Sequence, residues 1–161
     1  MQPTEIAAFF WRHCANDHGT DALHLPAWSL EDWTALLAHA QVMALARNEV
    51  LTKRGQAEQQ LYLLARGSLE VNAGAAGLAM GTLFRASPGA VIGEIAFFDG
   101  GQRSATVWAT EPSLLVALSR PEIETFAANR SQRGIELLLA LGRVLAFRVR
   151  RSEHGRQGLP F

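Results

Sequence analysis

Between residues 50 and 118 the chain breaks into short runs rich in β-branched, aromatic and leucine residues, and this feature most limits the folds open to it. Each run has the length of one strand, and glycine, proline or asparagine signals separate it from the next. Many short strands at this spacing are typical of a sandwich or a jelly-roll barrel. The runs cover residues 50–53, 60–65, 68–72, 78–84, 91–92, 103–109 and 113–118.

Helix signals precede this region. Thr4 can cap a helix that continues to about Cys14, with apolar residues at helical spacing. Farther along, Ser29 and Asp32 have the spacing of a capping box, in which each side chain accepts a hydrogen bond from the backbone N–H of the other residue. We therefore expect a second helix that ends near His39.

Helix signals also follow the strand region. Pro121 suits the first turn of a helix that ends near Asn129, and Ser131 can begin a longer one that ends near Arg151. These patterns predict an α+β fold in which a sandwich or jelly-roll barrel has helices at both of its ends.

The length of the chain suits one folded domain, and its charge balance makes a long-range electrostatic partner unexpected. A chain of 161 residues can bury about 70% of its unfolded surface. Its 15 Lys and Arg balance its 15 Asp and Glu, so no global field attracts nucleic acid or a membrane, and any anion site must be local. We expect a helical segment over residues 1–44, a ligand-binding domain over 45–151 that includes the last two helices, and a flexible tail over 152–161.

Cysteine content and hydropathy indicate the compartment. The single cysteine, Cys14, excludes an internal disulfide, and polar residues interrupt the first apolar run, which therefore lacks the pattern of a signal peptide. No uninterrupted apolar stretch approaches the roughly 18 residues that a membrane span needs. We expect a cytoplasmic protein with no membrane partner.

The stretch from residue 87 to residue 106 has the composition of a small anion pocket. Glu94 follows a glycine and begins a short apolar run that suits one helical turn, whose N–H groups favour an anion. Arg103 follows a glycine-rich loop and offers donors that match phosphate oxygens. Glu94 cannot bind the same phosphate because both are negative, so it needs a hydroxyl donor, which a ribose supplies. A phosphate at one end and a sugar hydroxyl at the other describe a nucleotide.

These residues resemble a known motif. Residues 93–96, Gly-Glu-Ile-Ala, and residues 103–106, Arg-Ser-Ala-Thr, are similar to the phosphate-binding cassette of the cyclic nucleotide-binding domains, with the spacing found in regulatory subunits of cyclic-AMP-dependent protein kinase. The resemblance covers roughly residues 45–151 and implies an eight-stranded antiparallel β-roll, similar to a jelly roll, with N-terminal helices, a short cassette helix after Gly93 and two C-terminal helices. It also includes residues 61–64, Gly67, Val71, Pro88 and Gly89.

The resemblance implies a role for the matching residues. Glu94 would accept a hydrogen bond from the ribose 2′-hydroxyl, Arg103 would neutralise the cyclic phosphate, and two backbone N–H groups would add donors. The Arg-Ser-Ala sequence is similar to that of the bacterial catabolite activators and implies a preference for cyclic AMP, while nearby hydroxyls leave cyclic GMP possible. The implied ligand-binding residues are Gly93, Glu94, Ile95, Ala96, Arg103, Ser104, Ala105 and Thr106.

Three features depart from the family pattern. Asn48 stands where glycine is usual, although asparagine also adopts left-handed turns. Residues 54–56, Arg-Gly-Gln, replace a common Glu-Gly-Asp, which would weaken a structural ion pair without touching the ligand. Few residues follow Arg151, so we expect a stand-alone sensor that lacks the DNA-binding module of the transcription-factor branch and acts on an unknown effector protein.

The last predicted helix is apolar on more than one side. One interpretation is core packing against the barrel. The other gives the helix two roles, as a lid over the base and as the seam of a homodimer. The candidate lid residues are Arg143, Phe147 and Arg148, and the seam at heptad spacing would be Ile135, Leu138, Gly142, Leu145 and Val149. Nucleic-acid binding is not expected, because no recognition helix or stacking platform accompanies the basic residues.

The predicted function is that of a cyclic nucleotide sensor, in which ligand draws the cassette inward and moves the C-terminal helices. No enzyme, metal or cofactor is expected, because the five histidines lie outside residues 50–118 and no nucleophile–base arrangement is recognisable. Two alternatives remain open. Glu94 and Arg103 would pair with each other and close the cassette, or the chain would be a protein–protein interaction module with an unoccupied cassette or one for a different anion.

Overall fold

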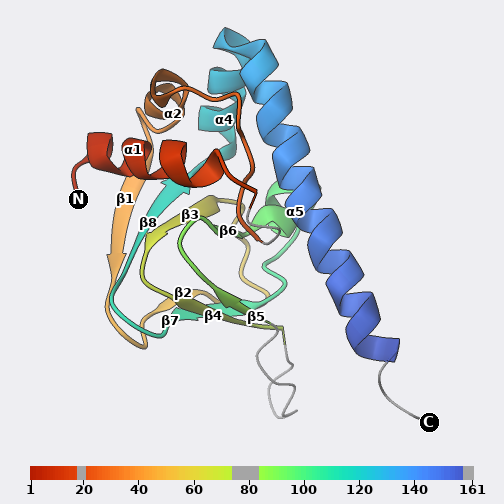
Figure 1. Cartoon of the computed structure of the whole chain (residues 1–161). Helices are drawn as coiled ribbons and strands as arrows, with labels where there is room; N and C mark the ends of the chain where they lie inside the picture. Colours follow the sequence, from red (N-terminus) through yellow and green to blue (C-terminus); the bar gives the residue numbers. More distant parts are fainter. Residues whose placement is uncertain (18–20, 74–83, 158–161) are drawn as a thin grey trace.

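A computed structural model shows a β-roll with helices over one end and a long helix along one side (Figure 1). The structure describes residues 1–17, 21–73 and 84–157, with side chains through Arg151. In this part of the chain, no helix is both long and apolar enough to cross a membrane.

Over the described residues, the strands confirm the predicted eight-stranded antiparallel roll. They are β1 (Gln41–Leu45), β2 (Val50–Thr52), β3 (Leu61–Arg66), β4 (Leu69–Asn72), β5 (Phe84–Ala86), β6 (Val91–Ile92), β7 (Thr106–Ala109) and β8 (Ser113–Leu118). They form two four-stranded sheets with the orders β1-β8-β3-β6 and β2-β7-β4-β5.

Two strands differ from the sequence prediction. β1 was not predicted: its sequence, Gln-Val-Met-Ala-Leu, is apolar but has one β-branched residue, and Met, Ala and Leu also favour a helix. The predicted strand over residues 78–84 lies outside the described residues except for Phe84, where β5 begins. Asn48 does adopt the expected left-handed backbone, with φ of 67°.

The helices are α1 (Pro3–Cys14), α2 (Leu30–Leu36), α3 (Glu94–Asp99), α4 (Arg120–Asn129) and α5 (Ser131–Gln157).

Helix boundaries differ from the expected ones at three ends. α1 begins at Pro3 with Gln2 as its N-cap, rather than at Thr4. α2 has the predicted capping box of Ser29 and Asp32 but ends at Leu36, before His39. α5 continues to Gln157, beyond the expected end near Arg151, so that residues 152–157 are helical.

β3 and β8, in the middle of the first sheet, are buried on both faces, because helices cover one face and the second sheet covers the other. Side chains alternate along β3: Leu61 and Leu63 belong to the cluster that includes α1, α2 and α5, whereas Tyr62 and Leu64 belong to the cluster inside the roll. This double burial explains why β3 reads as a continuous apolar run.

The helices are also joined to one another by charge. The Asp32 carboxylate accepts from Arg130 at 3.0 Å and from Arg133 at 3.1 Å, which links α2 to the junction of α4 and α5. Burial opposes ionisation of Asp32, but hydrogen bonds from Ser29 and the two arginine charges hold its pKa below the ordinary value. The N-terminal helices, α4 and the start of α5 therefore form one connected layer, from which the rest of α5 extends past α3 (Figure 1).

Candidate functional site

Glycine builds the turn from β6 into α3. Gly93 is the N-cap of α3 and has a left-handed backbone with φ of 91°. A Cβ atom at this position would lie 2.1 Å from Nη1 of Arg103 and 2.7 Å from the carbonyl oxygen of Gln60. Any side chain here would therefore displace Arg103, so Gly93 is needed both for the turn and for close packing.

Arg103 is buried beneath this turn. Its Nε donates to the Glu58 carboxylate at 3.3 Å, its Nη1 to the carbonyl of Gly93 at 3.3 Å and its Nη2 to the carbonyl of Gln60 at 2.7 Å. The guanidinium also lies 5.4 Å from the centroid of the Tyr62 ring. These contacts fix Arg103 between the start of α3 and the segment that leads into β3.

The backbone of Arg103 is held by the turn after β2. The Arg103 N–H donates to the carbonyl of Gln56 at 2.9 Å, and the N–H of Gly55 donates to the carbonyl of Arg103 at 2.8 Å. The unusual Arg-Gly-Gln sequence of this turn thus supports a predicted ligand-binding residue through its backbone. The Arg54 side chain points elsewhere, because its Nη1 donates to the carbonyl of Ala73.

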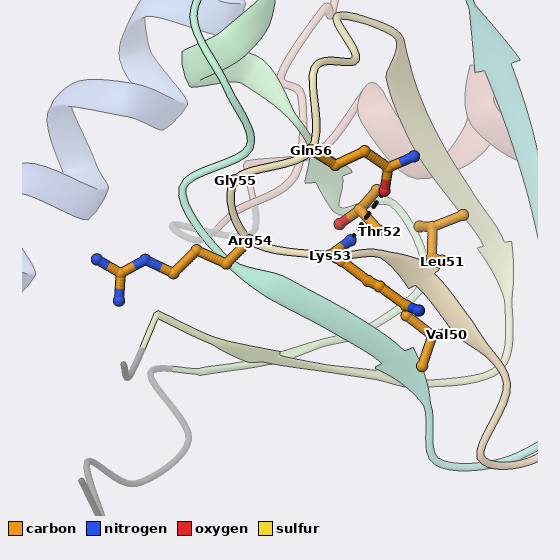
Figure 2. A pocket seen from close by; sticks show the side chains of 7 residues that line it. All are labelled: Val50, Leu51, Thr52, Lys53, Arg54, Gly55 and Gln56. Atoms are coloured by element: carbon orange, nitrogen blue, oxygen red, sulfur yellow. Dashed lines mark hydrogen bonds between the residues drawn. The ribbon is translucent and has the colours of Figure 1, made fainter. Parts of the chain in front are cut away.

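A surface pocket of about 570 Å³ lies on this same turn, lined by residues 50–56 (Figure 2). The Gln56 side chain accepts from the backbone N–H of Lys53 at 3.2 Å, while the Arg54 side chain points away from the other lining residues. None of the lining residues belongs to the predicted cassette, so we do not assign the ligand to this pocket.

Glu94, at the start of α3, pairs with a residue of the last helix. Its Oε2 lies 2.5 Å from Nη1 of Arg148, and the two side chains are 5% and 12% exposed. Arg148 also donates to Asp21 at 2.8 Å and to the carbonyl of Val91 at 2.6 Å. Its guanidinium lies 4.6 Å from the centroid of the Phe84 ring. The last helix is therefore bound to the cassette through Arg148.

The two cassette charges have different partners. Glu94 pairs with Arg148, whereas Arg103 pairs with Glu58. The alternative in which Glu94 and Arg103 pair with each other is therefore wrong.

The remaining predicted residues are placed less centrally. Ala96 and Ala105 are buried, Ile95 is on the exposed side of α3, and Ser104 is exposed. The Thr106 hydroxyl accepts from the backbone N–H of Arg54.

The candidate lid residues diverge along α5. Arg148 contacts the cassette directly. Phe147 is partly exposed and lies 5.7 Å from the guanidinium of Arg151, while Arg143 pairs with Asp17 at 2.7 Å. The structure therefore brings Gly93, Glu94, Arg103 and Arg148 together and leaves Arg143 apart.

Sequence reasoning missed two charged residues of the site. Glu58 lies in the segment before β3, and Asp21 lies in the segment between α1 and α2. Neither belongs to a motif. The one available signal was that a buried arginine needs an anionic partner. That partner could not be identified from its position in the sequence, because Asp21 and Arg148 are 127 residues apart.

Comparison with known proteins agrees with this geometry. The family model described as the cyclic nucleotide-binding domain matches residues 42–130, from β1 to the end of α4. The chain belongs to the cyclic nucleotide-binding domain family. The predicted resemblance is thus confirmed, and the match takes in β1, the strand that the sequence reading overlooked.

Solved structures of cyclic nucleotide-binding proteins share the fold. A cyclic nucleotide-binding domain from Methylobacillus flagellatus KT is 25% identical with a TM-score of 0.83, and the match covers 98% of this chain and 87% of that one. The catabolite activator protein of Thermus thermophilus is 26% identical with a TM-score of 0.71, over 81% of this chain and 60% of that one.

The regulatory domain of Toxoplasma gondii PKA, crystallised with cAMP, is 18% identical with a TM-score of 0.62, over 81% of this chain and 46% of that one. At this identity the likeness concerns the fold alone. These matches agree in a β-roll flanked by helices, which is a regulatory fold.

Proposed function

We propose that this domain is a cytoplasmic sensor that binds a cyclic nucleotide, with cyclic AMP preferred over cyclic GMP, and passes the signal through α5 to an effector protein. The observation that carries the proposal is the burial of Glu94 and Arg103 on either side of a turn that requires Gly93. A buried carboxylate and a buried guanidinium at this turn match a sugar hydroxyl and a cyclic phosphate. The Arg-Ser-Ala sequence supports cyclic AMP as the preferred ligand.

The carboxylate of Glu94 can serve the ligand and the helix at once. Arg148 contacts Oε2, so Oε1 is the oxygen that accepts the ribose 2′-hydroxyl. Because Arg148 belongs to α5, any change in the position of Glu94 changes the free energy of docking α5. The ligand shifts α5 only by its difference in affinity for the two arrangements.

Calorimetric titration with cyclic AMP and cyclic GMP tests the binding. We expect micromolar binding by the wild type and its loss in Arg103→Gln. Arg120→Gln, which removes one exposed arginine from α4, serves as the matched control and should bind as the wild type does. Thermal melts establish that each variant is folded.

A second titration tests the assignment of Glu94. Glu94→Gln should weaken cyclic AMP more than it weakens 2′-deoxy cyclic AMP, since the second ligand lacks the hydroxyl. An absence of heat with both cyclic nucleotides up to millimolar concentration would reject the sensor and favour the interaction module with an unoccupied cassette.

The outward face of α5 provides the seam for a second copy of this chain. Ile135, Leu138 and Val149 are 55%, 43% and 49% exposed and recur at heptad spacing. A Cβ atom added at Gly142 would meet nothing within 4 Å, so another helix can approach closely there.

Sedimentation equilibrium distinguishes a specific dimer seam from non-specific association through the exposed apolar residues of α5. Leu138→Glu should convert the dimer to a monomer. Leu139→Glu, which is one residue away at a position 70% exposed and off the heptad, should leave the dimer intact. A monomeric wild type, or equal effects of the two variants, would reject the seam.

A further inference from the structure

We propose that Glu58 is a built-in competitor of the ligand phosphate for Arg103 and thereby lowers the affinity of the site for anions. The inference rests on the proposed cyclic nucleotide binding and adds a residue that sets its strength. Glu58 belongs to the segment between β2 and β3 and lies outside both parts of the cassette motif.

Glu58 accepts a hydrogen bond from Nε of Arg103, a donor that a phosphate would use. Among the described contacts of Arg103 it is the only anion, since the other two acceptors are the backbone carbonyls of Gly93 and Gln60. The Arg103 side chain is 3% exposed, so a ligand cannot reach its guanidinium as the contacts stand. A phosphate that binds Arg103 must therefore share or replace the contact with Glu58.

A second donor holds Glu58 in this position. The Tyr62 hydroxyl donates to Oε1 of Glu58, while Oε2 faces Arg103. Burial of Tyr62 and its hydrogen bond to Glu58 raise the pKa of the phenol, so the hydroxyl remains a donor at neutral pH. The Glu58 carboxylate is thus stabilised from two sides in the absence of a ligand.

The charges joined to the two cassette residues cancel. Arg103 pairs with Glu58, while Arg148 and Arg151 pair with Glu94 and Asp21. Three cations and three carboxylates leave no net charge in this cluster. A cyclic nucleotide brings one negative charge, so its phosphate meets the full attraction of Arg103 only when a carboxylate withdraws.

Glu58 is the carboxylate best able to withdraw. Its side chain is 21% exposed, compared with 5% for Glu94 and 9% for Asp21. It lies outside the strands, so its movement breaks no sheet hydrogen bond, and water can solvate the released carboxylate. Glu94 and Asp21 cannot move into solvent in this way, because Arg148 of α5 pairs with both and covers them.

The test is calorimetric titration of Glu58→Gln with cyclic AMP. Glutamine has nearly the same shape: its amide oxygen can still accept from Arg103, while its NH2 group can donate to the oxygen of the Tyr62 hydroxyl, so the substitution removes the charge and retains the packing. We expect the Kd for cyclic AMP to fall roughly three- to tenfold, in the range of a partly exposed ion pair. Glu111→Gln, in the exposed turn before β8, changes the net charge equally and should leave the Kd unchanged.

A neutral ligand distinguishes the phosphate from the rest of the nucleotide. Adenosine, used as a competitor of cyclic AMP, should inhibit Glu58→Gln and wild type with the same constant, because it presents no phosphate to Arg103. Improved binding of adenosine by the variant would show a general loosening of the site and would overturn the inference.

The remaining outcomes are separable. Equal or weaker binding of cyclic AMP by a folded Glu58→Gln, with a wild type that binds, would overturn the competitor role and leave the sensor intact. A wild type that does not bind, together with a variant that does, would support the competition between Glu58 and the phosphate but would reject the wild type as a sensor. An absence of binding by both proteins would reject the competitor role of Glu58 and the proposed function together.

Discussion

Removal of Arg148 should be among the most damaging single changes in the described part of the chain, although this residue lies late in the last helix. In Arg148→Met the buried Glu94 loses its cationic partner, and among the described residues Arg151, at 3.4 Å, is the cation that Asp21 retains. Breaking a buried ion pair from one side costs about 3–5 kcal/mol, because the remaining charge is left without compensation. Methionine preserves much of the apolar stem of the side chain but removes the guanidinium that lies over the Phe84 ring.

The loss can be expressed as a change in melting temperature. Unfolding entropy is about 2.1 cal/mol/K per residue, or roughly 0.34 kcal/mol/K for a chain of this size. A loss of about 3–5 kcal/mol therefore predicts a drop in Tm of about 9–15 °C. Urea unfolding followed by circular dichroism gives the free energy directly, and a thermal scan gives the Tm.

The control is the same substitution on the same helix. Arg143 pairs with Asp17, and both side chains are 50% exposed, so Arg143→Met should cost no more than about 1 kcal/mol. A double-mutant cycle with Glu94→Gln isolates the Arg148–Glu94 term. If Arg148→Met costs no more than Arg143→Met, or if the cycle yields less than about 0.5 kcal/mol of coupling, the claim that Arg148 binds α5 to the cassette is wrong.

Three further predictions concern the scaffold. Asp32→Asn should reduce the free energy of unfolding by roughly 1.5–3 kcal/mol at pH 7. Because the native pKa of Asp32 lies below the ordinary 3.8, this difference in unfolding free energy should persist above pH 3.8 and disappear as the pH falls through the native pKa. A difference that does not depend on pH in urea titrations would contradict this. Gly67→Ala places a Cβ 2.2 Å from Oγ of Ser113 at φ of 93°, so it should cost about 2 kcal/mol or more in the same assay, and a stability equal to that of the wild type would refute the steric argument. Burial raises the pKa of Cys14 to about 12, so its thiol should react with a disulfide reagent at pH 8 only as fast as the protein opens, and immediate labelling would show that the thiol is accessible.

The parts of the fold that sequence alone predicts are those with a local cause. The capping box of α2 depends on Ser29 and Asp32, which are three residues apart, and the hydrogen bonds between them occur as expected. β3 reads as a strand because both of its faces are apolar. β1 was missed because its apolar residues suit a helix as well as a strand, so its pairing with β8, rather than its own pattern, determines its structure.

The same limit explains the candidate site. Glu94 and Arg103 belong to a motif whose glycines impose a local turn, so their proximity could be predicted. Their partners could not, because Glu58 is 45 residues from Arg103, and Arg148 comes from the far end of the chain. The sequence reading considered Arg148 only for stacking on a base, and the assignment of this residue to Glu94 required the packing of α5 against α3.

The pairing of both cassette charges inside the chain has a consequence for how a ligand can act. A buried arginine and a buried glutamate without partners would destabilise the ligand-free fold by several kcal/mol, so a domain that exists without ligand must satisfy them itself. Glu58 and Arg148 provide that satisfaction, but only Arg148 connects the cassette to a helix that leaves the roll. On the proposed function, replacement of Glu58 by the phosphate would change the affinity, whereas a change at Glu94 would reach α5. Arg103 would then determine how tightly an anion binds, and Glu94 would determine what is transmitted to the rest of the molecule.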